Sequence, residues 1–211
     1  MRSVTKIILV GGGVALAGWV GWGIYSTKKA KSVPYEQLRT VNGTEIRRYP
    51  QTILVETTAP TQRIAFQRLF RYISGANQGN ESISMTAPVE TQSGDSIAMT
   101  TPVRSEATGT EAETIRIAFY LPSEYTPETA PEPTEPDVTL VTEPQKTVAV
   151  DQFSWYAPEW RVTRRTQKLL STLEREDIEP EDDPYLLRYN DPWTPPFMRR
   201  NEVAVEVVEE G

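Results

Sequence analysis

The sequence predicts an α+β domain in which a curved antiparallel sheet, or distorted barrel, carries two helices packed against it. Three observations predict this class: about eight short strand patterns, two amphipathic helical patterns, and a strand–helix order that occurs twice. Such a set of elements buries its apolar faces together as a curved sheet with helices on it. The domain is expected over residues 32–211, because residues 1–31 differ in character.

The composition excludes several classes of function. The 211 residues suffice for one well-buried domain. The chain has no cysteine, and therefore no disulfide, thiolate nucleophile or zinc–cysteine site. It also has no histidine, which removes the commonest general base and the usual protein ligand of haem iron. The net charge of −7 argues against nucleic acid or an anionic membrane as a partner held by bulk charge.

Residues 7–25 are predicted to anchor the chain in a membrane as a single-pass helix, followed by a basic linker. This stretch has nineteen residues and no charge, and a helix of that length spans about 28 Å, close to a bilayer core. Its aromatic residues cluster toward one end, as they do at lipid–water boundaries. The alternative is a cleaved signal peptide, because Ala15-Leu16-Ala17 resembles a cleavage site. The domain would then be secreted or periplasmic; basic residues at both ends leave the membrane side open.

The first half of the domain is expected to form a hairpin, a strand and a helix. Asn42-Gly43 is a strong hairpin dipeptide between two brief strands, and Thr52–Thr58 is predicted as the next strand. In Thr61–Ser74 the apolar residues recur at helical spacing, and the first threonine can cap the helix. Gly75 is suited to end it.

The second half is expected to repeat this order. An exposed proline-rich loop over 123–137 separates the halves, and Arg199-Arg200-Asn201-Glu202 is expected to fix the last strand through ion pairs. The predicted elements are a strand at Thr114–Pro122, a strand at Lys146–Pro158, a helix at Glu159–Glu174, a strand at Tyr185–Asn190 and a strand at Asn201–Glu209.

The two predicted helices share a spacing that indicates internal duplication. Leu169, Leu170 and Leu173 lie one hundred positions after Leu69, Phe70 and Ile73. The Ala-Pro pairs that end the preceding strands lie ninety-eight apart. The chain is therefore interpreted as two copies of a strand–helix–strand–strand unit, although many α+β chains alternate in this way by chance.

The phrase Met-Thr-x-Pro-Val occurs twice, at Met85–Val89 and Met99–Val103. Proline supplies no amide hydrogen to a strand ladder and holds the preceding residue extended. Each copy is therefore expected to end a strand at a sheet edge. Both methionines are expected to pack inward, where a flexible thioether fills irregular space.

These motifs make the sequence resemble the SOUL family of haem-binding proteins. The resemblance is carried by "ISMTAPV", "IAMTTPV", "FRYISGANQGN", "LPSEYTPETAPEPTEPDV" and "RYNDPWTPPFMRRNEVAVEV", in order between Tyr35 and Glu209. It implies a distorted antiparallel β-barrel flanked by two long helices and built from two βαββ repeats. It also implies noncovalent binding of haem or another porphyrin. With the apolar amino-terminal segment, the chain is similar to a bacterial or archaeal type of member.

The resemblance further implies a ligand site between the first long helix and the loop before the last strand. Aromatic walls suit the apolar face of haem, and arginines can pair with its propionates. The alternative is that the helix aromatics pack in the core and that its arginines are surface charges. The predicted site residues are Arg63, Phe66, Phe70 and Arg71 from the helix and Tyr189, Trp193 and Phe197 from the loop.

Without histidine, the sequence leaves two ways to hold a porphyrin. A methionine (Met85, Met99 or Met198) or a tyrosinate such as Tyr189 could ligate iron. Otherwise the ring is held by its faces and propionates alone, and metal-free porphyrin would bind equally well. The alternative function is an effector-binding or scaffolding module for another amphipathic molecule or a protein partner. An enzyme is least favoured, because no nucleophile–base spacing or glycine-rich phosphate loop appears; no metal site is predicted.

Overall fold

A computed structural model of the chain describes residues 19–22, 31–94, 114–191 and 193–208. Most of the predicted anchor at 7–25 lies outside the described residues, and so does the second copy of the repeated phrase, Met99–Val103. Within the described ranges, no helix combines the length and the apolar character that a membrane crossing requires.

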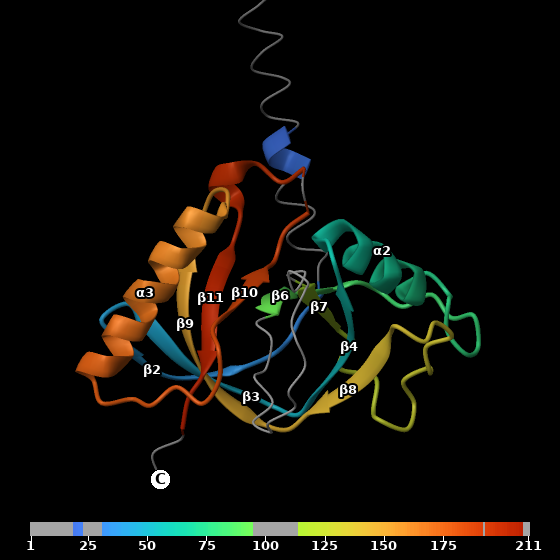
Figure 1. The fold of residues 1–211 in the computed structure, drawn as a ribbon, viewed down its shortest axis with the longest axis horizontal. Coiled ribbons are helices and arrows are strands. Elements are labelled where there is room, and N and C mark those ends of the chain that lie inside the picture. Colours follow the sequence, from blue (N-terminus) through green and yellow to red (C-terminus); the bar gives the residue numbers. More distant parts are fainter. Residues whose placement is uncertain (1–18, 23–30, 95–113, 192, 209–211) are drawn as a thin grey trace, which may run out of the picture.

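The domain consists of short strands and two α-helices (Figure 1). The helical elements are α2 (Gln62–Ile73), α3 (Glu159–Arg175) and the 3₁₀ helix η1 (Pro196–Met198). The strands are β1 (Lys31–Ser32), β2 (Glu36–Val41), β3 (Thr44–Tyr49), β4 (Thr52–Ala59), β5 (Thr86–Ala87), β6 (Val89–Gly94), β7 (Thr114–Tyr120), β8 (Thr139–Glu143), β9 (Lys146–Phe153), β10 (Tyr185–Arg188) and β11 (Asn201–Glu206).

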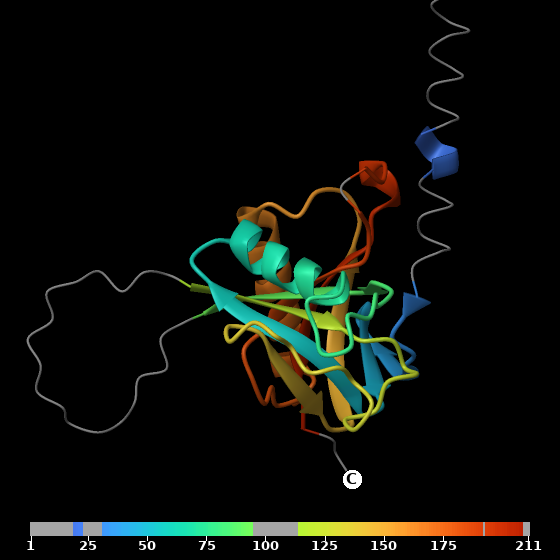
Figure 2. The same ribbon diagram turned by 90° about the vertical axis from the view of Figure 1, so that its right-hand side faces the viewer.

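Nine of these strands form one antiparallel sheet that curls into a half-barrel (Figures 1 and 2). The strand order is β2-β3-β9-β11-β10-β6-β7-β4-β8, while β1 and β5 form a separate parallel pair. The pairing of β6 with β10 joins the two halves of the sheet at its middle. This arrangement confirms the predicted α+β class with a curled antiparallel sheet.

Both helices pack on the same face of the sheet. Helix α2 covers β4 and β7 through a cluster that includes the fully buried Leu69, and α3 covers β9, β10 and β11 through a cluster that includes the fully buried Leu169. A third cluster on the opposite, inner face takes residues from both halves, among them Leu54, Val148 and Leu187. Side chains alternate between the faces of a strand, so strands such as β4 and β9 are buried on both faces.

The elements that local sequence signals predict in the first half of the domain are present in the structure. Asn42 and Gly43 have φ values of +50° and +82° and connect β2 to β3 in a tight hairpin. The Thr61 side chain accepts a hydrogen bond from the amide of Ile64 at 3.4 Å and caps α2. Gly75 follows the helix with φ +115°, the conformation that glycine adopts at least cost.

The prediction for the repeated phrase is confirmed only in part at its first copy. The two-residue strand β5 ends at Ala87, just before Pro88, but the last residue of the phrase, Val89, begins the long strand β6 of the main sheet. The side chain of Met85 is 41% exposed and does not pack inward. The reason is that β5 pairs with β1 outside the main sheet, so this segment does not follow the alternation of that sheet.

Two further differences concern strand length and number. The strand predicted to run to Pro158 ends at Phe153, because Trp155 has a positive φ and leaves the extended conformation. Strand β8, which pairs with β4, was not predicted. Its sequence, Thr-Leu-Val-Thr-Glu, lies just after the proline-rich loop and has too few apolar residues to stand out.

Replacing Leu69 or Leu169 by alanine is expected to lower the free energy of unfolding by about 2–5 kcal/mol each, because both side chains are fully buried. Urea denaturation of the variants measures this loss. The partly buried Leu170 provides the matched control in α3 and should lose less. Equal losses for Leu169→Ala and Leu170→Ala would contradict the assignment of the core face of α3.

Candidate functional site

The two predicted helix aromatics form a stacked pair at the edge of the core. The rings of Phe66 and Phe70 lie 6.3 Å apart with an angle of 13° between their planes. Phe66 also meets Phe119 of β7 edge-on at 5.2 Å. Both side chains remain partly exposed. The pair is therefore anchored to the sheet on one side and presents apolar ring surface on the other.

The two predicted helix arginines have different surroundings. Arg71 forms an ion pair with Glu135 in the proline-rich loop, with Nη2 and Oε2 at 2.8 Å. Arg63 is exposed and forms no ion pair with another described residue. A ligand carboxylate at Arg71 would have to compete with Glu135, so Arg63 is the more available cation of the two.

The predicted loop residues lie in two places. Trp193 and Phe197 are exposed in the segment between β10 and β11, and the Trp193 carbonyl accepts a hydrogen bond from the Trp19 indole at 2.7 Å. Tyr189, the residue after β10, instead lies on the inner face of the sheet and packs against the inner cluster. The structure thus brings Phe66 and Phe70 together, and Trp193 near Phe197, but it places Tyr189 on the face opposite α2.

Tyr189 belongs to a buried network centred on Glu202. The carboxylate of Glu202 is fully buried and accepts hydrogen bonds from Arg47 at 2.9 and 3.1 Å, from Tyr189 at 2.7 Å and from Arg200 at 2.8 Å. The guanidinium of Arg47 also stacks over the Tyr35 ring at 4.3 Å. Ion pairs were expected from the Arg199–Glu202 run, and the Arg200–Glu202 pair confirms this expectation. Arg47 was not predicted, because it lies 155 residues away from Glu202.

This network holds Tyr189 as a neutral phenol. Burial and the neighbouring Glu202 carboxylate raise the pKa of Tyr189 far above its ordinary value, and its hydroxyl donates to that carboxylate. A tyrosinate ligand for iron would need the opposite shift. The structure therefore argues against Tyr189 as an iron ligand, whereas Met198 is partly buried and Met85 is exposed.

Arg188 is a candidate site residue that the sequence analysis did not include. It lies in β10 at the middle of the sheet, on the face that carries both helices, because its neighbour Leu187 belongs to the inner cluster. Cross-strand register places Phe119, Val89, Arg188, Asn201 and Phe153 in one row across five strands. Phe66 of α2 contacts one end of this row, and α3 packs near the other.

Arg188 differs from Arg47 and Arg116 of the sheet because it has no acidic partner among the described residues. Arg47 and Arg116 each pair with carboxylates, whereas Arg188 donates to the hydroxyl of Thr91 at 3.1 Å and forms no ion pair with a described residue. Burial lowers the pKa of Arg188 below its usual value. An anionic group of a ligand would relieve this uncompensated desolvation.

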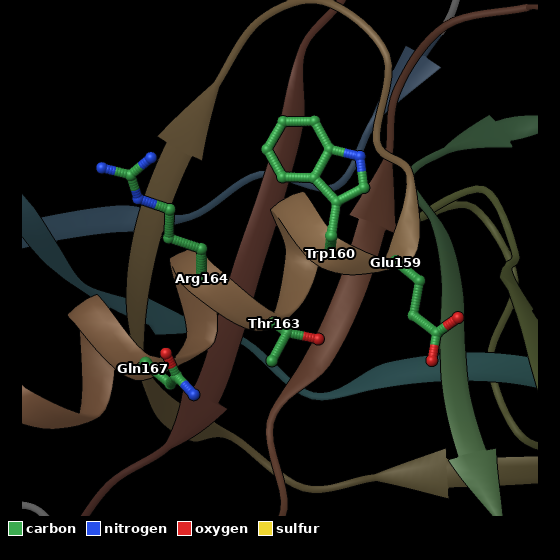
Figure 3. Close-up of a pocket in the computed structure, with 5 residues that line it drawn as sticks. All are labelled: Glu159, Trp160, Thr163, Arg164 and Gln167. Carbon is green, nitrogen blue, oxygen red and sulfur yellow. The ribbon is translucent and has the colours of Figure 1, made fainter.

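Two hollows lie elsewhere on the surface. The first, about 530 Å³, runs along the exposed side of α3 and is lined by Glu159, Trp160, Thr163, Arg164 and Gln167 (Figure 3). The second, about 260 Å³, is lined by Leu38, Arg39, Ile46, Arg48, Thr147, Ile178, Val207 and Val208. The described lining of the first comes from a single helix, so it is an open surface and does not enclose a ligand.

Comparison with known proteins gives a family match over nearly the whole domain. Residues 30–206 match the family described as "SOUL heme-binding protein". The chain is 29% identical to heme-binding protein 1 of Xenopus laevis over 64% of this chain and 65% of that protein. It is 26% identical to heme-binding protein 1 of Mus musculus over 86% of this chain and 88% of that protein. The match with the frog protein thus spans just under two thirds of its length.

Two solved structures share the fold at low sequence identity. The C-terminal domain of EcmrR superposes with a TM-score of 0.53 at 12% identity, covering 83% of this chain and 99% of that domain. A structure described as a hydrolase from Listeria innocua superposes with a TM-score of 0.56 at 13% identity, covering 85% of this chain and all of that one. At such identities the likeness concerns the fold alone.

Replacing Glu202 by glutamine is expected to cost about 3–5 kcal/mol of stability, because it removes the buried counter-charge of the fully buried Arg47 and leaves only the partly exposed Glu45. The measurement is the urea midpoint at constant slope. Glu45→Gln is the control, since Glu45 also pairs with Arg47 but is partly exposed and should lose much less. A Glu202→Gln protein as stable as the Glu45→Gln protein would show that the network is not needed for stability.

Proposed function

Because the chain belongs to the SOUL heme-binding protein family, we propose that it binds haem or a related tetrapyrrole without a covalent bond. The observation that carries this proposal is the family match over residues 30–206, which includes every strand of the sheet. The same match favours a binding role over a catalytic one. The absence of histidine and cysteine from the sequence supports this preference.

The proposed binding surface lies on the helix-bearing face, between α2 and the middle of the sheet. Phe66 and Phe70 supply aromatic surface, and Arg63 and Arg188 supply cations on either side. From Phe119, beneath the Phe66 ring, to Arg188 is two strand spacings, about 10 Å. An amphipathic ring with carboxylate side arms matches this combination of apolar surface and separated positive charge.

The remaining predicted residues take supporting places in this proposal. Arg71 contributes only if its ion pair with Glu135 opens. Trp193 and Phe197 border the surface from the loop before β11, and Tyr189 acts from the inner face by holding the start of that loop to Glu202. These assignments rest on the family resemblance together with the positions described above.

The ring is proposed to bind without a protein ligand to iron. Histidine and cysteine are absent from the chain, and Tyr189 is held as a neutral hydrogen-bond donor. Bound haem would supply a large apolar surface and carboxylates, while Phe66, Arg63 and Arg188 would orient it. Affinity would then come from ring contacts and carboxylate recognition.

We also propose that the domain is a duplicated unit. The segments β4–α2–β6–β7 and β9–α3–β10–β11 have the same element order along the chain. In the sheet their strands are arranged as β4-β7-β6 and β9-β11-β10, so the two units run in the same order from opposite sides toward the middle. The two units meet where β6 pairs with β10. Arg188 pairs with Val89 across this seam, so the proposed ligand surface lies between the units.

For the amino-terminal part we propose a membrane anchor at residues 7–25 within a segment 1–31, followed by the binding domain at 32–211. The support is the uncharged nineteen-residue sequence and its terminal aromatics. The cleaved-signal alternative makes a different proposal, a secreted or periplasmic domain. Mass analysis of the purified protein distinguishes the two. A membrane anchor leaves the chain intact in the membrane fraction, whereas a cleaved signal peptide leaves a shorter chain that lacks the amino-terminal peptide.

Ferric haem and protoporphyrin IX are expected to bind the 32–211 domain with affinities within about three-fold of each other, because no iron ligand contributes. Titration followed by the porphyrin absorption band and by tryptophan quenching measures both affinities. Haem bound about a hundred-fold more tightly would reveal an axial ligand. Failure of both to bind would favour the alternative function, an effector-binding or scaffolding module for another amphipathic molecule or a protein.

Replacing Arg188 by leucine is expected to weaken porphyrin binding by about ten- to a hundred-fold, because a hydrogen bond to a charged group is lost. The free energy of unfolding should stay equal or rise, because the replacement removes a desolvated cation. Arg188→Lys keeps the charge and is the matched control. The double variant Arg63→Glu, Arg71→Glu tests the helix cations in the same titration. Unchanged affinity in Arg188→Leu would exclude this residue while leaving porphyrin binding in place.

A further inference from the structure

All five tryptophans of the chain are exposed, which is unusual because tryptophan is on average well buried in globular proteins. The exposed fractions are 44% for Trp19, 50% for Trp22, 52% for Trp155, 67% for Trp160 and 76% for Trp193. None of the five belongs to any of the three core clusters. Their exposure therefore calls for an explanation other than packing.

Three of the exposed tryptophans and two further exposed aromatic side chains lie at one end of the domain. We name Trp155, Tyr156, Trp160, Trp193 and Phe197 the aromatic rim; Tyr156 is 56% and Phe197 48% exposed. Figures 1 and 2 both place the start of α3, the loop before it, η1 and the short helix at 19–22 at this end, whereas β2 and the end of β11 lie at the other.

The aromatic rim is held rigidly. The amide of Trp155 donates to the carbonyl of Pro196 at 2.9 Å, and its carbonyl accepts from the Asn201 side chain at 2.8 Å. These bonds fix Trp155 at φ +77°, a conformation that costs a bulky residue energy. Arg199 stacks on the ring of Tyr156 at 4.7 Å and donates to Thr194 at 2.9 Å. The two loops of the rim are thus tied to each other.

Cations accompany the aromatic rings. Arg161 and Arg164 lie near the amino terminus of α3, where the helix dipole favours acidic residues, and Arg199 lies beside the rim. In Figure 3, Trp160 and Arg164 project to the same side of the helix and Glu159 to the other. The acidic run over 174–183 follows the opposite end of α3. The three arginines thus outnumber the two acidic residues of the same segments, Glu159 and Asp191, which accepts the Trp193 amide, although the whole chain has a net charge of −7.

We propose that the aromatic rim is a docking surface for a lipid bilayer with anionic headgroups. Tryptophan and tyrosine rings with nearby arginines are the side chains that settle at a lipid–water interface. The indole of Trp19 donates to the Trp193 carbonyl, so the apolar amino-terminal sequence reaches the rim itself. The surface binds lipid independently of that sequence and of the tetrapyrrole.

The domain without its amino-terminal segment offers a direct test. The core clusters extend from Val33 to Val207, so residues 32–211 contain the whole core. This fragment retains three tryptophans, Trp155, Trp160 and Trp193, and all three belong to the rim. Their fluorescence therefore reports on the proposed surface alone.

The experiment adds vesicles of phosphatidylcholine, or of phosphatidylcholine mixed with phosphatidylglycerol, to residues 32–211 and follows tryptophan emission and cosedimentation. We expect a blue shift of the emission on binding. Binding to the mixed vesicles should be at least about ten-fold tighter than to the neutral ones, since each arginine near an anionic surface contributes to the binding free energy. Trp155→Ser, Trp160→Ser should weaken binding about ten-fold, with Trp193 remaining as the reporter.

Matched controls separate the surface from general stickiness. Leu38→Ser, Val208→Ser removes exposed apolar groups at the opposite end and should bind like the unaltered fragment. Trp160→Ser alone is a second test variant, needed if the Trp155 change disturbs folding, because Trp160 lies on the exposed side of α3 and its replacement should leave the fold intact. Absence of a blue shift with both vesicles, or equal binding by the tryptophan variants, overturns the proposal. Tryptophan-dependent dimerisation without lipid binding also overturns it, because the occupant would then be a second copy.

Discussion

The carboxylate of Glu202 is the interaction on which the arrangement of this domain most depends. It is fully buried on β11 and accepts hydrogen bonds from Arg47 of β3, from Arg200 just before β11 and from Tyr189 just after β10. A buried carboxylate must be paired and hydrogen-bonded to be tolerated. The hydrogen bonds to this carboxylate therefore hold two parts of the domain in place, the β2–β3 hairpin at the edge of the sheet and the loop between β10 and β11. That loop carries Trp193 and Phe197, so the position of the exposed aromatic residues follows from a buried charge.

The seam between β6 and β10 determines which residues face the proposed ligand surface. Alternation along β10 places Leu187 in the inner cluster and Arg188 on the helix-bearing side. Because α2 and α3 cover the outer parts of the sheet, the strands at the seam are the ones whose helix-bearing face is left partly exposed: Val89, Thr91 and Arg188 are only partly buried. The curvature of the sheet thus produces two different surfaces, a closed polar interior and a partly open strip that combines apolar groups with one cation.

Local sequence signals predicted the helices and the first hairpin, because their causes lie within a few residues. A capping threonine, an Asn-Gly turn and a helical apolar stripe act over short distances. The signals failed where pairing partners are distant in the chain. Arg47 and Glu202 are 155 residues apart, and "YLLR" is buried on both faces, so no alternation in the sequence showed that Arg188 and Tyr189 point to opposite sides. Met85 was misplaced for the same reason, since the strand that follows it, β5, pairs with the distant β1.

The described chain departs from local stability rules at two notable places. Four non-glycine residues have positive φ; three are asparagine or aspartate, which tolerate it, and the fourth is Trp155. Arg188 is a desolvated cation without an acidic partner among the described residues. Sequences usually retain such costs where a function compensates for them. One departure lies on the seam and the other on the aromatic rim, and β11 adjoins both, because Asn201 holds the Trp155 backbone and pairs with Arg188 across the strands. The proposed ligand surface and the proposed lipid-docking surface are therefore parts of one rigid framework, in which the orientation of the domain on a bilayer would fix the orientation of the seam.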